Sequence, residues 1–129
     1  MINIKEHTFK ENHRAFVDFY NHIMGNELYD YDNQNIKYDH LKDLLNHHFP
    51  KNSLSFEFMV DYFLNRGVLI GFTPIAINGE CSMWSAIGIT HDNILVCNDF
   101  YNWKDAFDKC IEYGFQLLNG KLLSTKNIN

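Results

Sequence analysis

The dipeptide Asn78-Gly79 lies between two apolar runs and is the feature that most limits how this chain can fold. Both central residues of a two-residue hairpin turn need positive φ angles, which Asn and Gly adopt more readily than other residues. We therefore predict a three-stranded antiparallel meander over residues 68–99, with its second turn near His91-Asp92. Counting outward from the first turn gives these pairs: Ile77 with Glu80, Ala76 with Cys81, Phe72 with Ser85, and Ile70 with Ile87.

Side chains alternate between the two faces of a strand, so this register assigns every residue of the meander to a face. The expected core face carries the larger apolar residues: Val68, Ile70, Phe72, Ala76, Cys81, Met83, Ile87, Ile89, Ile94 and Val96. The second face is smaller, half polar and centred on Trp84; it also carries Ala86, Gly88, Leu95, Cys97 and Asp99. Cys81 and Cys97 then lie on opposite faces and cannot form a disulfide.

Apolar residues at three- and four-residue spacing predict three helices before the meander and one after it. The first spans Thr8 to Met24, with Thr8 and Glu11 as a capping box and Gly25 as its stop. Asp39 caps a second helix, which ends at Phe49 before Pro50, and Ser53 or Ser55 caps a third that ends near Asn65. The last begins at the Asn102 cap and ends at Gly120.

The expected fold is α+β, with the order α-α-α-β-β-β-α in one domain over residues 1–129. Residues 1–52 form the helical front, residues 53–120 an α-β-β-β-α unit, and residues 121–129 a tail expected to fray. We expect the N-terminal helices to cover the Trp84 face, which gives a helix–sheet–helix sandwich. A covered face predicts a monomer, whereas an open one would favour a homodimer.

The charge balance argues against nucleic acid as a partner. The α-β-β-β-α order resembles the double-stranded-RNA-binding domain, which implies lysines at the start of the last helix. Here that start reads Trp103-Lys104-Asp105, and residues 53–129 contain five Lys and Arg against eight Asp and Glu. With a net charge of −5 for the whole chain, direct binding to phosphate backbones is not expected.

The N-terminal residues lack a basic region followed by an apolar stretch, and the longest apolar run is too short for a bilayer. We therefore expect no membrane association. The three cysteines, Cys81, Cys97 and Cys110, have no metal-binding spacing. An odd number of cysteines favours free thiols and a cytoplasmic location.

Two patterns raise the question of catalysis. The run from Cys81 to Asp99 resembles the strand, turn and strand of bacteriocin-type papain-like cysteine peptidases, with Asn98 and Asp99 at the position of the family's acidic or amide residue. That family implies a His at the start of the first strand, where this chain has Ser82-Met83-Trp84, and a Cys upstream, where residues 1–80 have none. We therefore assign no catalytic residue and no cofactor.

The second pattern is a possible metal site. His40, Asp43 and His47 share one face of the second helix and form a candidate set of ligands for a divalent ion. The alternative is that they form an ordinary solvated helix face, and a small metal-dependent hydrolase stays a secondary hypothesis.

The remaining candidate residues are suited to protein contacts. Tyr29, Asp30, Tyr31 and Asp32 alternate aromatic area with negative charge, a composition that favours binding to a basic protein partner. The alternative is a solvated loop whose Tyr rings fold back on the core. Trp84 and Asp99 mark a second candidate surface, for a protein or for a small molecule.

The end of the meander and the start of the last helix, from Asp99-Phe100-Tyr101-Asn102-Trp103 to Gly114-Phe115, resemble small accessory proteins of phages and mobile elements. That resemblance implies a protein that binds a host or competitor protein, as anti-CRISPR inhibitors do. Our leading hypothesis is a small acidic protein-binding module that inhibits or regulates a partner. A toxin-immunity protein, a metal-dependent or cysteine hydrolase and a small-molecule-binding domain are the alternatives.

Overall fold

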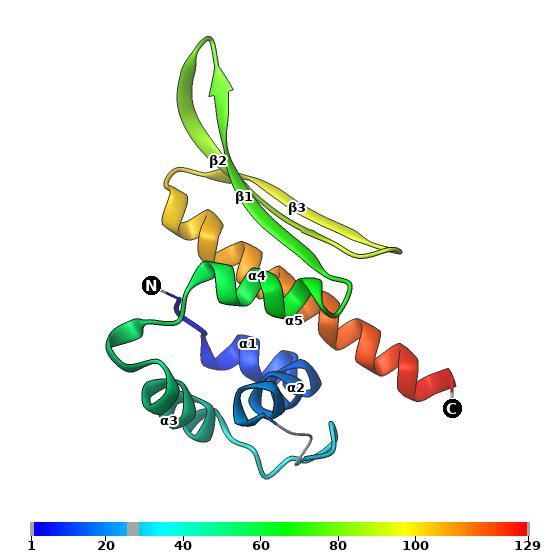
Figure 1. Ribbon diagram of the computed structural model, residues 1–129. Coiled ribbons are helices and arrows are strands. Elements are labelled where there is room, and N and C mark those ends of the chain that lie inside the picture. The colour runs from blue at the N-terminus through cyan, green and yellow to red at the C-terminus, as the bar shows by residue number, and fades with distance from the viewer. Residues whose placement is uncertain (1, 26–28, 129) are drawn as a thin grey trace.

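The computed structural model describes residues 2–25 and 29–128, with side chains for 2–25, 29–51 and 53–123. The fold is α+β. It begins with α1 (Glu6–Glu11), α2 (His13–Met24), α3 (Tyr38–His48), a short 3-10 turn η1 (Pro50–Asn52) and α4 (Phe56–Leu64). An antiparallel sheet in the order β1-β2-β3 follows, made of β1 (Leu69–Ile77), β2 (Glu80–Ile89) and β3 (Ile94–Phe100). The long helix α5 (Trp103–Ile128) completes the chain (Figure 1).

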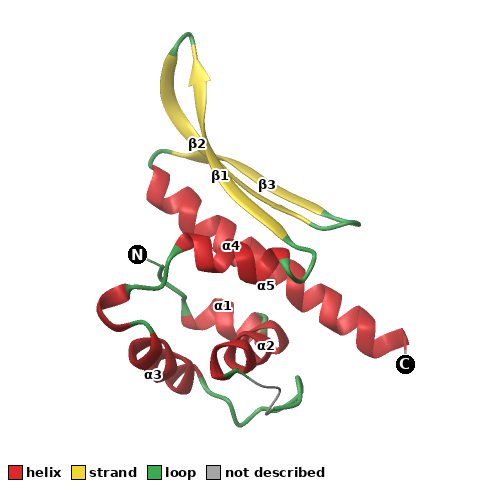
Figure 2. Cartoon of the chain, in the orientation of Figure 1, coloured by secondary structure: helices red, strands yellow, loops and turns green. Residues whose placement is uncertain are grey.

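The elements form layers in the order sheet, α5 with α4, and then α1 to α3 (Figure 2). The helix α5 is buried on two sides, because Ala106 and Cys110 are fully buried and Phe115 stacks on Phe16 of α2 at 3.9 Å between ring centroids. The predicted helix–sheet–helix sandwich is therefore wrong. The N-terminal helices cover the far side of α5 and do not cover a face of the sheet.

Most local signals place the helix ends correctly. Gly25 ends α2 with φ 86°, Ser55 accepts the amide of Phe58 at 3.1 Å, and Asn102 accepts the amide of Asp105 at 2.9 Å. The second helix begins at Tyr38, one residue before the predicted cap. The prediction that Gly120 ends the last helix is wrong, because α5 continues through it to Ile128.

The single first helix of the prediction is two helices, with a break at Asn12 (φ −124°, ψ 40°). The side chain of Asn12 donates to the Thr8 carbonyl at 3.0 Å, which stabilises the end of α1. Thr8 is buried inside α1, so its predicted role as an N-cap is also wrong.

The Asn78-Gly79 turn is confirmed, with φ angles of 54° and 81°, and so are the pairs Ile77–Glu80 and Ala76–Cys81. Beyond them, Ile75 pairs with Met83, which leaves Ser82 as an extra residue in a β-bulge. A one-residue shift reverses the faces of a strand, so the predicted pairs of Phe72 with Ser85 and Ile70 with Ile87 are wrong. The observed pairs are Phe72 with Ala86 and Ile70 with Gly88.

The bulge puts the smaller face of β2 and β3 against α5, opposite to the prediction. Ala86 and Gly88 are buried, whereas Cys81, expected in the core, is exposed. A Cβ on Gly88 would lie 2.8 Å from the Cβ of Tyr113, so the helix approaches the sheet too closely for any side chain there. Small residues on this face are what permit that approach.

The other face of the sheet meets no helix in the described part of the chain, and all the helices lie on the opposite side (Figure 1). Cross-strand pairing arranges its side chains in rows across the three strands. We call this surface the open sheet face; its apolar residues are Leu69, Gly71, Ile75, Met83, Ile87, Ile89, Ile94 and Val96. Three of them are about half exposed or more: Leu69 at 46%, Val96 at 48% and Ile94 at 62%.

Candidate functional site

The β1–β2 hairpin extends past the start of α5 (Figure 1), and aromatic side chains of β1, β2, α4 and α5 pack together in this region. Phe72 lies at the centre, with the ring centroid of Trp84 at 6.1 Å and that of Trp103 at 6.4 Å. Phe56 and Phe107 pack beneath Phe72 at 5.4 and 5.5 Å. The inner rings anchor the cluster in the core, while the outer ones remain accessible.

The accessible part of this cluster is large. Trp103 is 48% exposed, and Tyr101, two residues earlier in the chain, is 83% exposed. We call Phe72, Trp84, Tyr101 and Trp103 the aromatic surface. Trp and Tyr supply large contact areas with few rotatable bonds, and they are the residues most often found at binding hot spots.

Local hydrogen bonds hold this surface in place. Asn102 caps α5, and its side-chain amide donates in return to the Asp105 carboxylate at 2.9 Å. This reciprocal cap fixes the first turn of the helix and therefore the position of Trp103. Asp99 lies next to this region, because the following residue, Phe100, pairs with Trp84 across the sheet. The side chain of Asp99 is exposed. Its carboxylate accepts the thiol of Cys97, and that hydrogen bond raises the pKa of Cys97.

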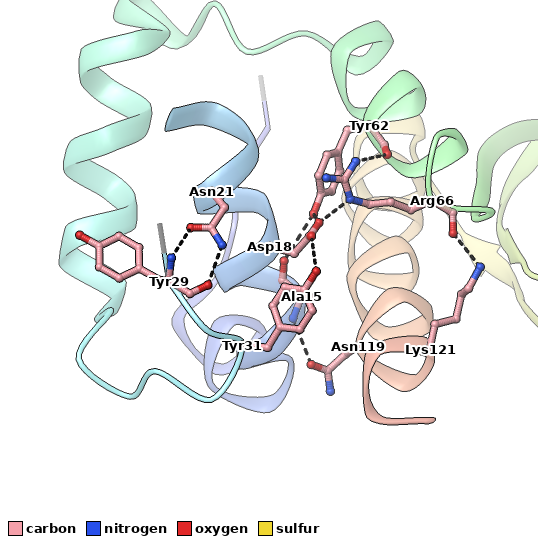
Figure 3. A network of polar contacts seen from close by, with 9 residues as sticks. All are labelled: Ala15, Asp18, Asn21, Tyr29, Tyr31, Tyr62, Arg66, Asn119 and Lys121. Carbon is pink, nitrogen blue, oxygen red and sulfur yellow. Dashed lines mark hydrogen bonds and ion pairs between the residues drawn. The ribbon is translucent and has the colours of Figure 1, made fainter. Parts of the chain in front are cut away.

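Residues 29–32, between α2 and α3, lie at the opposite end of the molecule from the sheet (Figure 1). Trp84 is on β2 and Asp99 on β3, so the predicted contact residues form two separate surfaces. Asn21 holds Tyr29 by two hydrogen bonds, at 2.9 Å to its carbonyl and 3.2 Å from its amide (Figure 3). The Tyr31 hydroxyl donates to Asp18 at 3.1 Å. Asp32 pairs with Arg14, and Asp30 is exposed. The loop is thus tied to α2, and its carboxylates face solvent.

The sequence reading missed the residue at the centre of this network, Asp18. Its carboxylate accepts the hydroxyl of Tyr62 at 2.6 Å and forms an ion pair with Arg66, while the Arg66 side chain also donates to the Tyr62 carbonyl at 3.3 Å (Figure 3). Burial, and then the negative charge of Asp18, raise the pKa of Tyr62 well above its usual range. The sequence contains one indication that Asp18 is a buried and paired carboxylate: it stands between the apolar residues Val17 and Phe19 on a helix with a strong apolar stripe.

The candidate metal ligands lie along α3. His40, Asp43 and His47 are all exposed there, and the Nδ1 atom of His40 accepts the backbone amide of Lys37 at 3.1 Å. Over residues 2–25 and 29–128, no group of three or more His, Cys, Asp or Glu side chains is arranged to hold a metal ion. His40, Asp43 and His47 are thus not brought together as a metal-binding group in this part of the chain.

A cavity of about 410 Å³ lies between the N-terminal segment, the end of β3 and α5. Asp105, Asp108 and Lys109 contribute charged groups to its wall. The Oδ1 atom of Asp108 is buried with no hydrogen-bond partner in the described structure, and burial raises the pKa of this carboxyl. Cys97 and Phe100 also line this cavity, and Phe100 pairs with Trp84, so the cavity lies next to the aromatic cluster.

The cysteines differ strongly in their surroundings. Burial raises the pKa of Cys110 to about 12, so its thiol is not a nucleophile at neutral pH. Cys81 is exposed on the hairpin and donates weakly to the Met83 carbonyl at 3.7 Å. A hydrogen-bonded pair of a Cys and a His is absent from the contacts of the described residues, and this arrangement is what a cysteine hydrolase needs.

Across the described ranges we find no helix with the length and apolar character needed to cross a membrane. Comparison of the chain with protein-family models, with curated proteins and with solved structures finds no match.

Proposed function

We propose that this protein is a small protein-binding module that inhibits or regulates a partner, and that the aromatic surface is its contact site. The observation that carries the proposal is the exposure of Tyr101 and Trp103 beside Trp84, at 83% and 48% for the first two. The exposed parts of these rings do not contribute to the buried core of the fold. Contact between their apolar surface and water is unfavourable, and a partner that covers the rings removes that unfavourable contact.

The chemistry of the surface defines the kind of partner. Glu80 is exposed on β2, the strand that holds Trp84, Asp99 is exposed on the neighbouring strand β3, and the chain has a net charge of −5. We therefore propose a protein partner with basic residues around an apolar centre, since opposite charges at the rim accelerate association and select the partner. The three unpaired cysteines are compatible with a cytoplasmic setting. An accessory role against a host or competitor protein, as in phages and mobile elements, fits this chemistry.

The test is affinity capture from a lysate of the source cells with three forms of the chain. The wild type should retain one protein in stoichiometric amount, and Trp103→Ala should reduce its retention by at least about tenfold, as expected for a hot-spot residue. Leu123→Ala is the matched control, because Leu123 is also about half exposed, at 43%, but lies far along α5. Equal retention by the wild type and Trp103→Ala would refute the assignment of the surface.

Salt provides a second readout of the same proposal. Charges at the rim of an interface are screened, so retention of the partner should fall as salt increases. Asp99→Asn should remove part of that salt dependence while leaving the aromatic contacts in place.

A further inference from the structure

The open sheet face is an apolar surface separate from the aromatic surface. Its central row runs from Gly71 on β1 through Ile87 on β2 to Val96 on β3, and the row beside it contains Leu69, Ile89 and Ile94. Contiguous apolar surface of this kind on a small domain marks an association site.

The chemistry of this face is unlike that of the rest of the chain. No Asp, Glu, Lys, Arg or His occurs among its rows, although the chain has 27 acidic and basic residues in total and a net charge of −5. The polar side chains of Thr73, Ser85 and Asn98 form one row between the central row and the Ile75–Met83 pair, and the Ser85 hydroxyl donates to the Asn98 side chain at 2.6 Å. A basic partner would find no carboxylate here, so the occupant must itself present an uncharged, apolar surface.

We propose that this occupant is a second copy of the chain, and that two copies stack sheet on sheet about a twofold axis that runs along β2 near Ile87. The same uncharged face on each copy brings no like charges together, and about this axis each row meets its equivalent. Ile87 lies on the middle strand and meets Ile87 of the second copy, while Gly71 on β1 has no side chain and leaves space for Val96 of the second copy. Two such faces pack about 10 Å apart, as in β-sandwiches.

The area sets the strength of this dimer. Three strands about 4.8 Å apart and seven residues long at about 3.3 Å each give a flat footprint near 300 Å² per copy. Pleating increases the accessible area, but the total stays near or below the roughly 1,200 Å² at which stable interfaces begin. The dimer should therefore be weak and should dissociate on dilution through the micromolar range.

The net charge of the chain predicts how dimerisation depends on salt. Each copy has a net charge of −5 that lies away from the contact, so the two copies repel at long range and contact through apolar groups. Added salt screens that repulsion, and dimerisation should strengthen with salt. The binding proposed for the aromatic surface weakens with salt, so the two associations are distinguishable. The dimer uses a different surface and does not depend on the proposed function.

The test is sedimentation velocity of the full chain from low micromolar to several hundred micromolar concentration. The wild-type mass should rise from 15.2 kDa toward twice that value. Val96→Lys should stay monomeric at every concentration, because a twofold interface would bury the new charge twice and weaken association by at least about 100-fold. Leu64→Lys is the matched control, since Leu64 is 54% exposed against 48% for Val96 but lies on α4, on the helical side of the sheet.

Circular dichroism checks that each variant folds. If Val96→Lys fails that check, Ile87→Thr replaces it, because Thr keeps the branched Cβ suited to a strand and should weaken the dimer by about tenfold. A wild type that is monomeric at every concentration would overturn the proposal. So would a dimer that persists in the folded variant, because that result would place the contact elsewhere, such as the outer edge of β3. Neither result affects the capture experiment with Trp103→Ala.

Discussion

Two glycines of α5 offer a sharp test of how α4 and α5 pack. Gly114 and Gly120 are on the same helix, and Ala at either site favours the helix by about 1 kcal/mol. Their surroundings differ. A Cβ on Gly120 meets nothing within 4 Å, whereas a Cβ on Gly114 would lie 2.5, 2.6 and 2.9 Å from three ring atoms of Phe63. Carbon atoms in contact prefer about 3.5–4.0 Å, so α5 or the ring must move by about 1 Å.

Phe63 has no free space for that movement. Its side chain is fully buried and packs edge-on against Phe115 at 4.9 Å between ring centroids. Overpacking of a rigid core costs about 1–3 kcal/mol, and this site falls at the upper end. After the gain in helix propensity, Gly114→Ala should destabilise the protein by about 2 kcal/mol, whereas Gly120→Ala should stabilise it by about 0.5–1 kcal/mol.

The assay is urea unfolding followed by far-ultraviolet circular dichroism, with the midpoints of the two variants compared with that of the wild type. The double variant Gly114→Ala/Phe63→Leu should be less destabilised than the sum of its single changes, because the smaller side chain makes room for the new methyl group. Equal midpoints for Gly114→Ala and Gly120→Ala would refute the close approach of the two helices.

The other predictions test the sheet register and the buried network. Thiol labelling in the native state should modify Cys81 quickly, and Cys110 only on unfolding, because Cys81 is exposed and Cys110 is fully buried. Thermal unfolding of Asp18→Ala should show a loss of about 2–4 kcal/mol, because it leaves buried partners unpaired; the exposed control Asp61→Ala should lose less than about 0.5 kcal/mol. Burial keeps the pKa of Tyr62 raised in the folded state. Its stabilising contribution should therefore be complete below the usual Tyr pKa of about 10 and be lost as pH rises above it; melts from neutral to alkaline pH should show this decline, and Tyr62→Phe should reduce it.

The parts of the fold that could be predicted from the sequence depend on chemistry within a few residues. The Asn78-Gly79 turn, the Gly25 stop and the Ser55 and Asn102 caps each satisfy backbone groups or φ angles locally. Residue type and spacing are enough to recognise them. The class of the fold and the order of its elements follow from the same signals.

The bulge at Ser82 has no such local signal. Ser fits a regular strand as well as a bulged one, and the extra residue is needed only because the turn and the core impose different registers. The turn requires Ile77 opposite Glu80, while close packing on α5 requires Gly88 and Ala86 to face inward. A sequence reading that extends the turn register along the whole hairpin therefore assigns β2 to the wrong faces.

The candidate site was predictable only in part. Trp84 belongs to the aromatic surface and Asp99 stands near it, but Trp103 was not among the predicted contact residues. Helical spacing cannot show where the sheet stops covering the last helix, and Trp103 lies in the first turn of α5, beside the base of the projecting hairpin. The position of two aromatic residues on either side of the Asn102 cap is the signal that could have found this surface.

Which face of the sheet meets α5 is decided by distance rather than by apolar content. The open sheet face carries the β-branched residues of β2 and β3, but Ile87 and Val96 would keep the helix axis farther from the sheet and separate Tyr113 and Leu117 from the backbone that they contact. With Gly88 in that position, Tyr113 and Leu117 of α5 pack directly on the strand. Their nearest side-chain atoms lie 2.8 and 3.0 Å from the position that a Cβ of residue 88 would occupy. Tight packing therefore uses the small side chains of β2, Ala86 and Gly88, and leaves Ile87 and Val96 on the open sheet face.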